Sequence, residues 1–396
     1  MKITDLKTTI LSVPFSQPTF WPFGRWDGST VVIIEIETDE GITGLGESLC
    51  LQSSAAEAVE LLIQGTKPLL IGQDPFDTER IGKTIEGLGA WNPYGRHFAG
   101  YTLGGIDMAL WDIAGKACNQ PVYKLLGGKI RGTAEGFKFI RHGKPEIMAA
   151  EAQAAVTKGY RTIYCKYTDI EHLENAIQAI RAAIGYKPKL WVDFNQTLSP
   201  GFAVSFLKKM ENYRIDIAEQ PVLRSNLDGM VYVRNSVSTQ ILAHESCWTI
   251  SDTLNVINKG AADIISAEPR MSWGLMATKK AAALAEAAGM PVVMHSSAEL
   301  GIAQASFLHI IASTPNFILA NQCMYDWFDD DYIKGGKLSF DGPFLTVPEA
   351  PGLGVELDRD KILKYHENYK EVGTYALSSL NTKELRSVPP PLFPSY

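Results

Sequence analysis

Short apolar runs and longer amphipathic runs alternate along the chain from about residue 133. The apolar runs fit strands at residues 134–140, 162–165, 190–192, 215–218, 241–243, 264–267, 292–294 and 317–320. Between them, apolar positions at helical spacing predict helices, for example at 145–158, 171–183, 203–212 and 276–288. Eight strands alternating with helices favour a closed barrel of parallel strands. The alternative, an open doubly wound sheet, would be expected to carry a glycine-rich turn after its first strand, and none follows residues 136–140.

The chain before this alternation has a different pattern. Alternating residues predict strands at about 1–13 and 31–49, with a hairpin turn at Asp39-Glu40-Gly41. Residues 15–26 carry proline, glycine and several aromatic rings, so we predict a loop that packs on the rest of the protein. Helices are predicted at 55–70, 75–85 and 105–117, which together with the strands define an α+β domain. The Pro- and Gly-rich stretch from about residue 341 is expected to wrap back onto it.

Polar side chains follow the predicted strands at a nearly constant interval. At spacings of 23 to 27 residues, the series is Lys166, Asp193, Glu219, Glu245, Glu268, His295 and Asn321. In a barrel of parallel strands, the carboxyl ends of the strands open onto one shared pocket. The spacing therefore predicts that these side chains meet in an active site.

Three successive members of the series are the carboxylates Asp193, Glu219 and Glu245. Acidic groups crowded together repel one another unless a cation neutralises them. Carboxylates are hard oxygen donors, which favour Mg²⁺, with Mn²⁺ as an alternative, whereas zinc prefers His or Cys ligands. For a single carboxylate a surface salt bridge would be the better explanation, but three at this spacing predict a metal site.

Lys166 and His295 are the candidates for acid–base chemistry. Lys166 ends the second predicted strand, where a neighbouring cation would lower its pKa and make it a general base. His295 follows the seventh strand, on the other side of the barrel, and Glu268 ends the sixth. A carboxylate one strand away can accept the imidazole N–H and fix its tautomer, so Glu268 and His295 are predicted to form a dyad.

Composition limits the possible partners. The 396 residues carry a formal charge of −7 and no Lys/Arg-rich block, which argues against a nucleic-acid partner. No apolar run approaches the length of a membrane span, so no membrane partner is expected. The five cysteines are dispersed without a CxxC pair, as expected for reduced thiols in the cytoplasm.

Several short motifs follow one another along the chain. Each is a weak indicator of a family by itself, but their order and spacing together are specific. They are Gly44-x-Gly46-Glu47 after the hairpin, the helix at 107–116 with Leu125-Leu126-Gly127-Gly128, and the strand ends Val192-Asp193-Phe194-Asn195-Gln196, Ala218-Glu219-Gln220-Pro221 and His244-Glu245-Ser246. In these motifs the chain resembles the enolase superfamily and, within it, the mandelate racemase/muconate lactonizing enzyme family. The resemblance covers nearly the whole chain.

The resemblance implies an α/β fold with three parts. These are an N-terminal α+β capping domain at 1–128, a modified TIM barrel, (β/α)₇β, at 129–355, and a segment at 356–396 that packs back on the cap. It also implies one Mg²⁺ per subunit on the three carboxylates, and abstraction of the proton α to the carboxylate of a small-molecule substrate to give a metal-stabilised enediolate. A homo-oligomer, commonly a dimer or octamer, is expected.

The sixth and seventh strands point to a subgroup. Lactonizing-type relatives have a lysine where this chain has Glu268, whereas racemase-type relatives and many acid-sugar dehydratases pair a histidine with an acid, as His295 and Glu268 would. Dehydration of an acid sugar is the first hypothesis; a racemase, epimerase or lactone cycloisomerase using Lys166 and His295 is the alternative. A metal-dependent hydrolase would typically need His-x-His at the first strand, which residues 137–139 lack. A non-catalytic barrel would not need the three carboxylates.

Four positions depart from the family pattern that the resemblance implies. Tyr164 replaces the first lysine of Lys-x-Lys, Glu268 replaces the usual Asp, His244 stands where Asp-Glu is common, and Asn321 replaces a substrate-binding glutamate. The predicted substrate contacts are Tyr164, Asn195, Asn321, Arg25 and Trp21. The last two belong to the aromatic segment with Phe23 and Trp26, whose rings alternatively only seal the barrel mouth.

Overall fold

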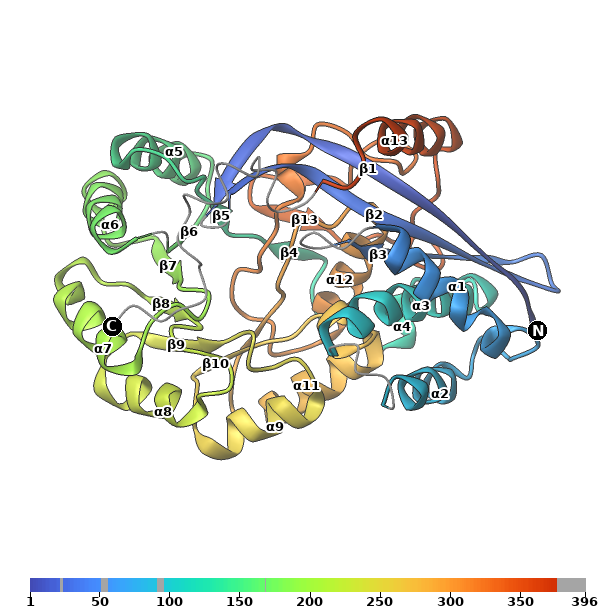
Figure 1. Cartoon of the computed structure of the whole chain (residues 1–396), viewed down its shortest axis with the longest axis horizontal. Helices are drawn as coiled ribbons and strands as arrows, with labels where there is room; N and C mark the ends of the chain where they lie inside the picture. Colours follow the sequence, from blue (N-terminus) through green and yellow to red (C-terminus); the bar gives the residue numbers. More distant parts are fainter. Residues whose placement is uncertain (22–23, 51–55, 91–95, 168, 376–396) are drawn as a thin grey trace.

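Seven parallel strands form the central sheet, in the order β11-β10-β9-β8-β7-β6-β5 (Figure 1). They are β5 (Lys138–Phe139), β6 (Thr162–Lys166), β7 (Lys189–Asp193), β8 (Ile217–Glu219), β9 (Gln240–Ala243), β10 (Ile264–Ser266) and β11 (Val292–Val293). This computed structural model describes residues 1–396 except 22–23, 51–55, 91–95, 168 and 376–396, and a few further side chains, among them that of Trp21, lie outside the description.

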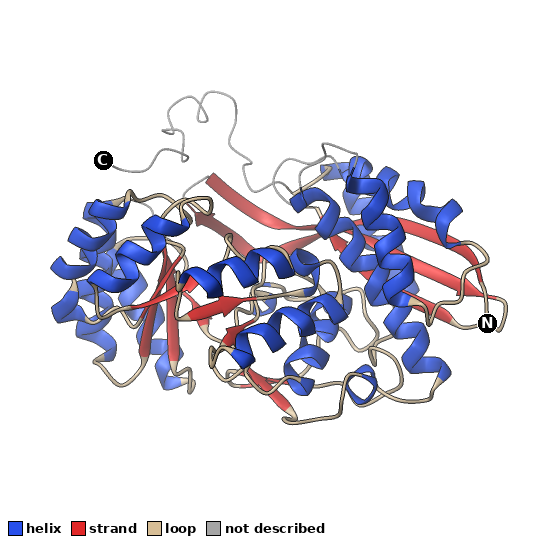
Figure 2. Cartoon of the chain, turned by 90° about the horizontal axis from the view of Figure 1, so that it is seen from below, coloured by secondary structure: helices blue, strands red, loops and turns tan. Residues whose placement is uncertain are grey.

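Helices follow the strands and cover the outside of the sheet (Figure 2). They are α5 (Pro145–Thr157), α6 (Ile170–Ile184), α7 (Pro200–Lys209), α8 (Leu227–Ser236), α9 (Ile250–Lys259), α10 (Pro269–Ser272), α11 (Leu275–Ala287) and α12 (Gly301–Ser313). Because the sheet is covered on this face and filled by side chains on the other, the middle of each strand is buried, and an uninterrupted apolar run is needed there. The predicted alternation of strand and helix is confirmed.

The eighth predicted strand, at 317–320, is not formed as a strand. Asn321 takes its place: its backbone N–H donates to Glu135 O at 2.7 Å and its carbonyl accepts from Phe137 N at 2.9 Å. On the other side, the Asn321 side-chain oxygen accepts from the Met294 backbone N–H at 2.8 Å, where a strand would offer a carbonyl. This residue therefore bridges the two edges of the seven-stranded sheet without a regular ladder.

The first predicted strand, at 134–140, is divided in two. β4 (Thr133–Glu135) pairs antiparallel with β13 (Phe344–Thr346), which pairs with β12 (Phe340–Asp341), in a small sheet outside the barrel. Only β5 belongs to the barrel. The division falls at Gly136, whose N–H donates to Pro343 O at 2.7 Å, so the chain changes partner there.

The N-terminal part is an antiparallel sheet of β1 (Ile3–Trp21), β2 (Gly24–Thr38) and β3 (Thr43–Leu49) covered by helices. The helices are α1 (Ala56–Leu70), α2 (Thr78–Ala90), α3 (Arg96–Ala117) and the short α4 (Val122–Leu125). The predicted hairpin is confirmed, with Gly41 at φ 77° in the turn between β2 and β3. A Cβ atom at Gly44 or Gly46 would collide with carbonyl oxygens of α3, which explains the two glycines of this motif. The chain thus has a seven-stranded parallel sheet, with Asn321 in place of the last strand of the expected (β/α)₇β barrel, and the expected α+β capping domain.

The predicted loop at 15–26 is wrong, because β1 extends to Trp21, β2 begins at Gly24, and the two strands pair up to these residues. The pairing shifts register between Pro14 and Thr19, and this irregularity places Pro18 where no regular ladder bond is required. The aromatic residues do pack as expected. Trp26 is buried, with its ring centroid 5.1 Å from that of Phe15 and 6.0 Å from that of Trp327 of the barrel domain.

The last described helix, α13 (Arg359–Val372), packs against β1 (Figure 1). The Asn368 side chain donates to Ser12 O at 2.7 Å, and His366 Nδ1 lies 2.9 Å from Ile10 O. All five cysteines are free thiols, and only Cys118 is exposed. Among the described helices, none is both long enough and apolar enough to cross a membrane.

Two buried acids lie where the capping domain meets the barrel, and one of them, Glu47, joins the two domains. Glu47 of β3 accepts from the Leu300 N–H at 2.8 Å and from the hydroxyl of Tyr332. Asp331 accepts from the Tyr332 N–H at 2.6 Å and from the hydroxyl of Tyr325. Burial raises the pKa of Glu47 to about 7 and that of Asp331 to about 8, although these hydrogen bonds oppose the shift.

We predict that the free energy of unfolding falls as the pH rises from about 5 to about 8, because in this range the folded protein still holds the protons of Glu47 and Asp331 while the unfolded chain has released them. In an unfolded chain they titrate near pH ~4, so their contribution is complete below that pH and is lost as the pH passes through their folded pKa values. Asp331→Asn keeps an acceptor for Tyr332 N–H and offers Tyr325 a donor, so it should flatten this dependence. Thermal unfolding followed by circular dichroism measures it.

Asp330→Asn is the control. Hydrogen bonds from Lys361 and Tyr365, opposing burial, lower the pKa of Asp330 to about 2, so this acid is ionised in both states throughout the range and its removal should leave the slope unchanged. Equal slopes in the wild type and in Asp331→Asn would contradict the prediction.

Candidate active site

Adjacent strand ends bring the first predicted site residues into register. Lys166, the last residue of β6, lies opposite Asp193 of β7, which lies opposite Glu219 of β8. Asp193 and Glu219 are buried, and the Lys166 side chain is 14% exposed. The parallel ladder alone therefore sets these three side chains next to one another at the mouth of the barrel.

The backbone turns sharply just after these strand ends. Asn195, Gln196 and Gln220 have φ values of 43°, 68° and 36°, in the left-handed region that residues with a side chain rarely adopt. The Gln220 side-chain oxygen accepts from His244 N at 3.0 Å and from Ser246 N at 3.2 Å. This buried amide fixes the turn that carries His244 and Glu245.

Lys166 is held by two neighbours. Its ammonium donates to Asp193 Oδ2 at 2.7 Å and to the Asn195 side-chain oxygen at 3.0 Å. Burial alone would lower the pKa of Lys166, but the Asp193 and Glu219 carboxylates outweigh it and raise the pKa. The lowered pKa expected of a general base would therefore require the charge of a bound cation.

Tyr164 supports Asp193 from inside the barrel. Its hydroxyl donates to Asp193 Oδ2 at 2.7 Å, and its ring stacks on Phe137 with centroids 4.5 Å apart. Tyr164 is fully buried. A residue in this position contacts the predicted metal ligand and has no surface left for the substrate contact predicted from the sequence.

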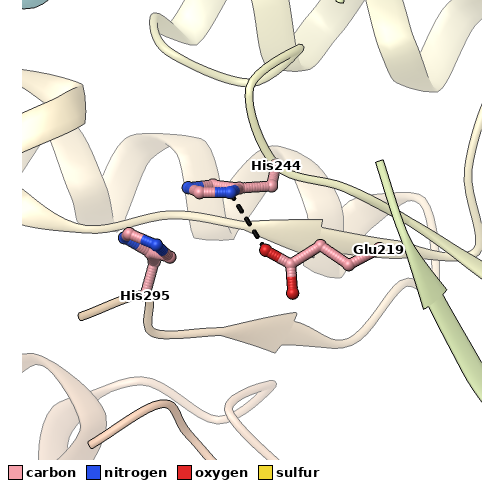
Figure 3. A group of neighbouring side chains, drawn as sticks. All are labelled: Glu219, His244 and His295. Atoms are coloured by element: carbon pink, nitrogen blue, oxygen red, sulfur yellow. Dashed lines mark ion pairs between the residues drawn. The ribbon is translucent and has the colours of Figure 1, made fainter. Parts of the chain in front are cut away.

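Glu219 has one oxygen fixed and one facing the site. The indole N–H of Trp191 donates to Oε2 at 2.8 Å, and Oε1 lies 3.0 Å from His244 Nδ1 (Figure 3). Burial, followed by the Asp193 charge, raises the pKa of Glu219 to about 7. The carboxylates are thus crowded enough that this one resists ionisation, which is the condition that a cation relieves.

His244 lies between the two glutamates. Its Nδ1 atom is 3.4 Å from Glu245 Oε2, in addition to its contact with Glu219. Burial would lower the pKa of His244, but Glu245 and Glu219 raise it to about 9. Within the described part of the chain, neither ring nitrogen makes a hydrogen bond of good geometry, and neither does Glu245 Oε2.

His295 packs against His244, with ring centroids 3.9 Å apart and planes inclined by 32°. Burial lowers the pKa of His295 well below its usual value, and the positive charge of His244 adds to this effect. Figure 3 shows the two rings next to each other, on the side of the site where Glu219 lies. Among the described residues, Glu219, His244 and His295 form the one group whose potential metal-ligand atoms all lie within 4.8 Å of one another.

The predicted dyad of His295 and Glu268 is loose. His295 Nδ1 lies 3.7 Å from Glu268 Oε1, beyond hydrogen-bond distance. Glu268 instead forms a two-point ion pair with Arg270, which donates from Nε to Oε2 at 2.6 Å and from a terminal nitrogen to Oε1 at 2.7 Å. Arg270 also pairs with Glu299, and all three side chains are fully buried. The spacing missed Arg270, although a cation two residues after a strand-end acid was a visible signal.

The remaining predicted contacts fall in different places. Asn195 does lie in the site, where its amide is 3.5 Å from Glu245 Oε1 and its own N–H donates to Asp193 at 2.8 Å. The side chain of Asn321 is taken up by barrel closure, with its amide near Leu319 O and Glu135 O. Arg25 is half exposed and pairs with Asp27 at 2.6 Å. The Trp21 side chain and Phe23 lie outside the described residues.

The donor set fits a divalent cation. Glu219, His244 and His295 offer a carboxylate oxygen and imidazole nitrogens within 4.8 Å of one another, and Asp193 and Glu245 lie next to this group. Both ring nitrogens of His244 and Glu245 Oε2 lack a hydrogen bond of good geometry among the described residues. The Lys166 ammonium stands at the edge of this group. The site is therefore able to combine a cation with a lysine beside it, which suits proton removal from a carbon acid.

Comparison with known proteins identifies the class. Residues 5–127 match the family described as mandelate racemase/muconate lactonizing enzyme, N-terminal domain, and residues 147–361 match that described as enolase C-terminal domain-like. The chain belongs to the enolase superfamily and, within it, to the mandelate racemase/muconate lactonizing enzyme family. It is an enzyme of the isomerase and hydro-lyase chemistry found among these relatives.

Individual relatives differ in reaction. The hydrophobic dipeptide epimerase of Enterococcus faecalis is 30% identical over 90% of this chain and 99% of its own. The D-galactonate dehydratase of Ralstonia pickettii is 28% identical over 92% of this chain and 94% of its own. The crystal structure of the Enterococcus faecalis dipeptide epimerase with Mg and L-Leu-L-Tyr has a TM-score of 0.83 and 28% identity, covering 90% of this chain and all of that one.

We predict that Arg270→Met destabilises the protein by roughly 3–5 kcal/mol, because it leaves Glu268 and Glu299 buried without their shared cation. Combining it with Glu268→Gln should recover part of this loss. The measurement is denaturant-induced unfolding.

Lys259→Met, which removes an exposed ion pair with Asp228, is the matched control and should change stability by less than about 1 kcal/mol. If Arg270→Met were as mild as this control, the buried ion pairs would not stabilise the site.

Proposed function

We propose that this enzyme removes the proton α to the carboxylate of a small-molecule acid, with Lys166 as the base and a divalent cation on the neighbouring carboxylates. The observation that carries the proposal is the register of Lys166, Asp193 and Glu219 on three adjacent strand ends. The relatives named above, both epimerase and dehydratase, are consistent with this shared step.

The sequence-predicted cofactor is Mg²⁺, one per subunit, on Asp193, Glu219 and Glu245. When bound, the cation would stabilise the negative charge that develops on the substrate carboxylate and would offset the charges that now raise the pKa of Lys166. Asn195 contacts Lys166, Asp193 and the Glu245 side chain, so it sets the direction of the ammonium. Trp191 and Tyr164 hold the carboxylates from behind.

For an acid sugar, the sequence favours dehydration. The α C–H bond breaks and its proton passes to Lys166 Nζ; the electron pair forms the C=C bond as the β C–O bond breaks. This reaction requires His295 to carry the proton with which the hydroxyl leaves as water, and the enol product becomes a 2-keto acid. The buried position of His295 across the site from Lys166 suits a group that acts on the opposite side of the substrate.

A second candidate, epimerisation, is favoured by the state of His295. Burial, the largest of the causes that lower the pKa of His295, favours the neutral imidazole that a proton acceptor must be. Lys166 and His295 would then exchange the α-proton on opposite faces, with no bond to oxygen broken. The substrates would be acids with one acidic α-hydrogen, such as dipeptides or N-succinyl amino acids, on which relatives act according to their names.

The test is α-deuterium incorporation in D₂O with divalent cation, over a panel of aldonic acids, aldaric acids, dipeptides and N-succinyl amino acids. We predict that Lys166→Met reduces incorporation roughly a hundredfold or more, because it removes the base. Lys209→Met, at an exposed lysine of α7 that pairs with Glu174, should retain it. Formation of a 2-keto acid identifies dehydration, and inversion at the α-carbon identifies epimerisation. Full exchange in Lys166→Met would reject this lysine as the base.

A further inference from the structure

The group of side chains that could hold a metal ion, Glu219, His244 and His295, contains imidazole nitrogens, which the sequence-predicted set of three carboxylates lacks. Glu219 Oε1 and His244 Nδ1 are 3.0 Å apart. Two ligands of a cation with bond lengths of about 2.0–2.1 Å lie about 3 Å from one another, so this pair is already at coordinating separation. Glu245 is placed differently, since its Oε1 faces the Asn195 amide at 3.5 Å.

We infer that His244, rather than Glu245, completes the metal site with Glu219, and that the site prefers a borderline cation of the Zn²⁺ or Co²⁺ type over Mg²⁺. The inference rests on the proposed function only in placing a cation at these strand ends. Mg²⁺ is a hard cation that takes oxygen ligands, whereas imidazole nitrogen suits zinc, cobalt and iron.

Three features of His244 point to a ligand. Its side chain is only 7% exposed, and neither ring nitrogen has a hydrogen bond of good geometry among the described residues. Its backbone is fixed, because the Gln220 side chain accepts from its N–H at 3.0 Å. Its partner is fixed as well, because Trp191 occupies Glu219 Oε2 and turns Oε1 toward the imidazole. Such outer contacts orient the ligands of metal sites.

His295 belongs to the same group but is not required as a ligand. In the proposed function His295 is an acid–base group. If Glu219 and His244 hold the cation, the imidazole of His295 remains available for that role. Glu245, 3.4 Å from His244 Nδ1, then balances the charge of the site from the next position in the chain. The two alternatives for the third ligand are consecutive residues, so paired substitutions separate them.

The test measures binding of Co²⁺, Zn²⁺ and Mg²⁺ to the chelator-treated full chain by calorimetry, with the visible absorption of Co²⁺ as a second readout. We expect His244→Asp to lower the ratio of Co²⁺ to Mg²⁺ affinity by about tenfold or more and to change the Co²⁺ spectrum. Glu245→Gln should leave the ratio of Co²⁺ to Mg²⁺ affinity and the Co²⁺ spectrum unchanged. His244→Asn, which also lacks the imidazole but adds no charge, should lose Co²⁺ affinity and serves if His244→Asp does not fold.

The second histidine pair, His142 and His172, controls for adventitious binding. These rings are 4.6 Å apart and not fully buried, so His142→Asn should leave the Co²⁺ spectrum of the site intact. The inference would be overturned if Glu245→Gln or His142→Asn, and not His244→Asp, changed the Co²⁺ spectrum or the ratio of Co²⁺ to Mg²⁺ affinity. Absence of any cation binding would also overturn it. Deuterium exchange supported by Mg²⁺ through Glu245 would overturn it while leaving the proposed function intact.

Discussion

The structure depends on how buried carboxylates at the strand ends are neutralised. Asp193, Glu219 and Glu268 are fully or almost fully buried, and a buried charge is costly unless it is paired. The chain places one basic side chain beside each of these carboxylates. Lys166 pairs with Asp193, His244 with Glu219 and Arg270 with Glu268. The mouth of the barrel is therefore lined by ion pairs. The chemistry of the site depends on which of these pairs can exchange a proton or a metal ion and which cannot.

Arg270 differs from the other two cations in this respect. A guanidinium stays protonated and binds Glu268 through two nitrogens, so this pair is a fixed part of the core. Lys166 and His244 can each lose a proton, and their partners can each accept a metal. The fixed pair explains why Glu268 is a poor partner for His295: its oxygens are already used. The exchangeable pairs are where a cation, a substrate and a moving proton are expected.

The sequence predicted the architecture well because a parallel barrel buries both faces of its strands, so each strand appears as an apolar run. The interval from Lys166 to His295 followed from the same repeat, since each strand–helix unit adds a similar number of residues. The pattern could not show which way each side chain points. Asn321 continues the interval, yet its side chain replaces a strand carbonyl and closes the barrel. Residues 15–26 looked like a loop because proline disfavours strands, but a register shift in the hairpin accommodates them.

Two departures from the family pattern gain a joint explanation from the geometry. Against the pattern implied by the resemblance, Tyr164 loses the positive charge of a lysine, and His244 loses the negative charge of an aspartate. Both positions face the same cluster, since the Tyr164 hydroxyl reaches Asp193 and the His244 imidazole reaches Glu219. If the imidazole is neutral, as a metal ligand must be, the two changes cancel and the formal charge of the site is preserved. The cancellation fails if either change occurs alone, because the remaining carboxylates would then face one cationic group too few or too many. The substitution of a nitrogen donor for an oxygen donor is then the chemical difference that remains, and it acts on the choice of cation more than on the charge of the site.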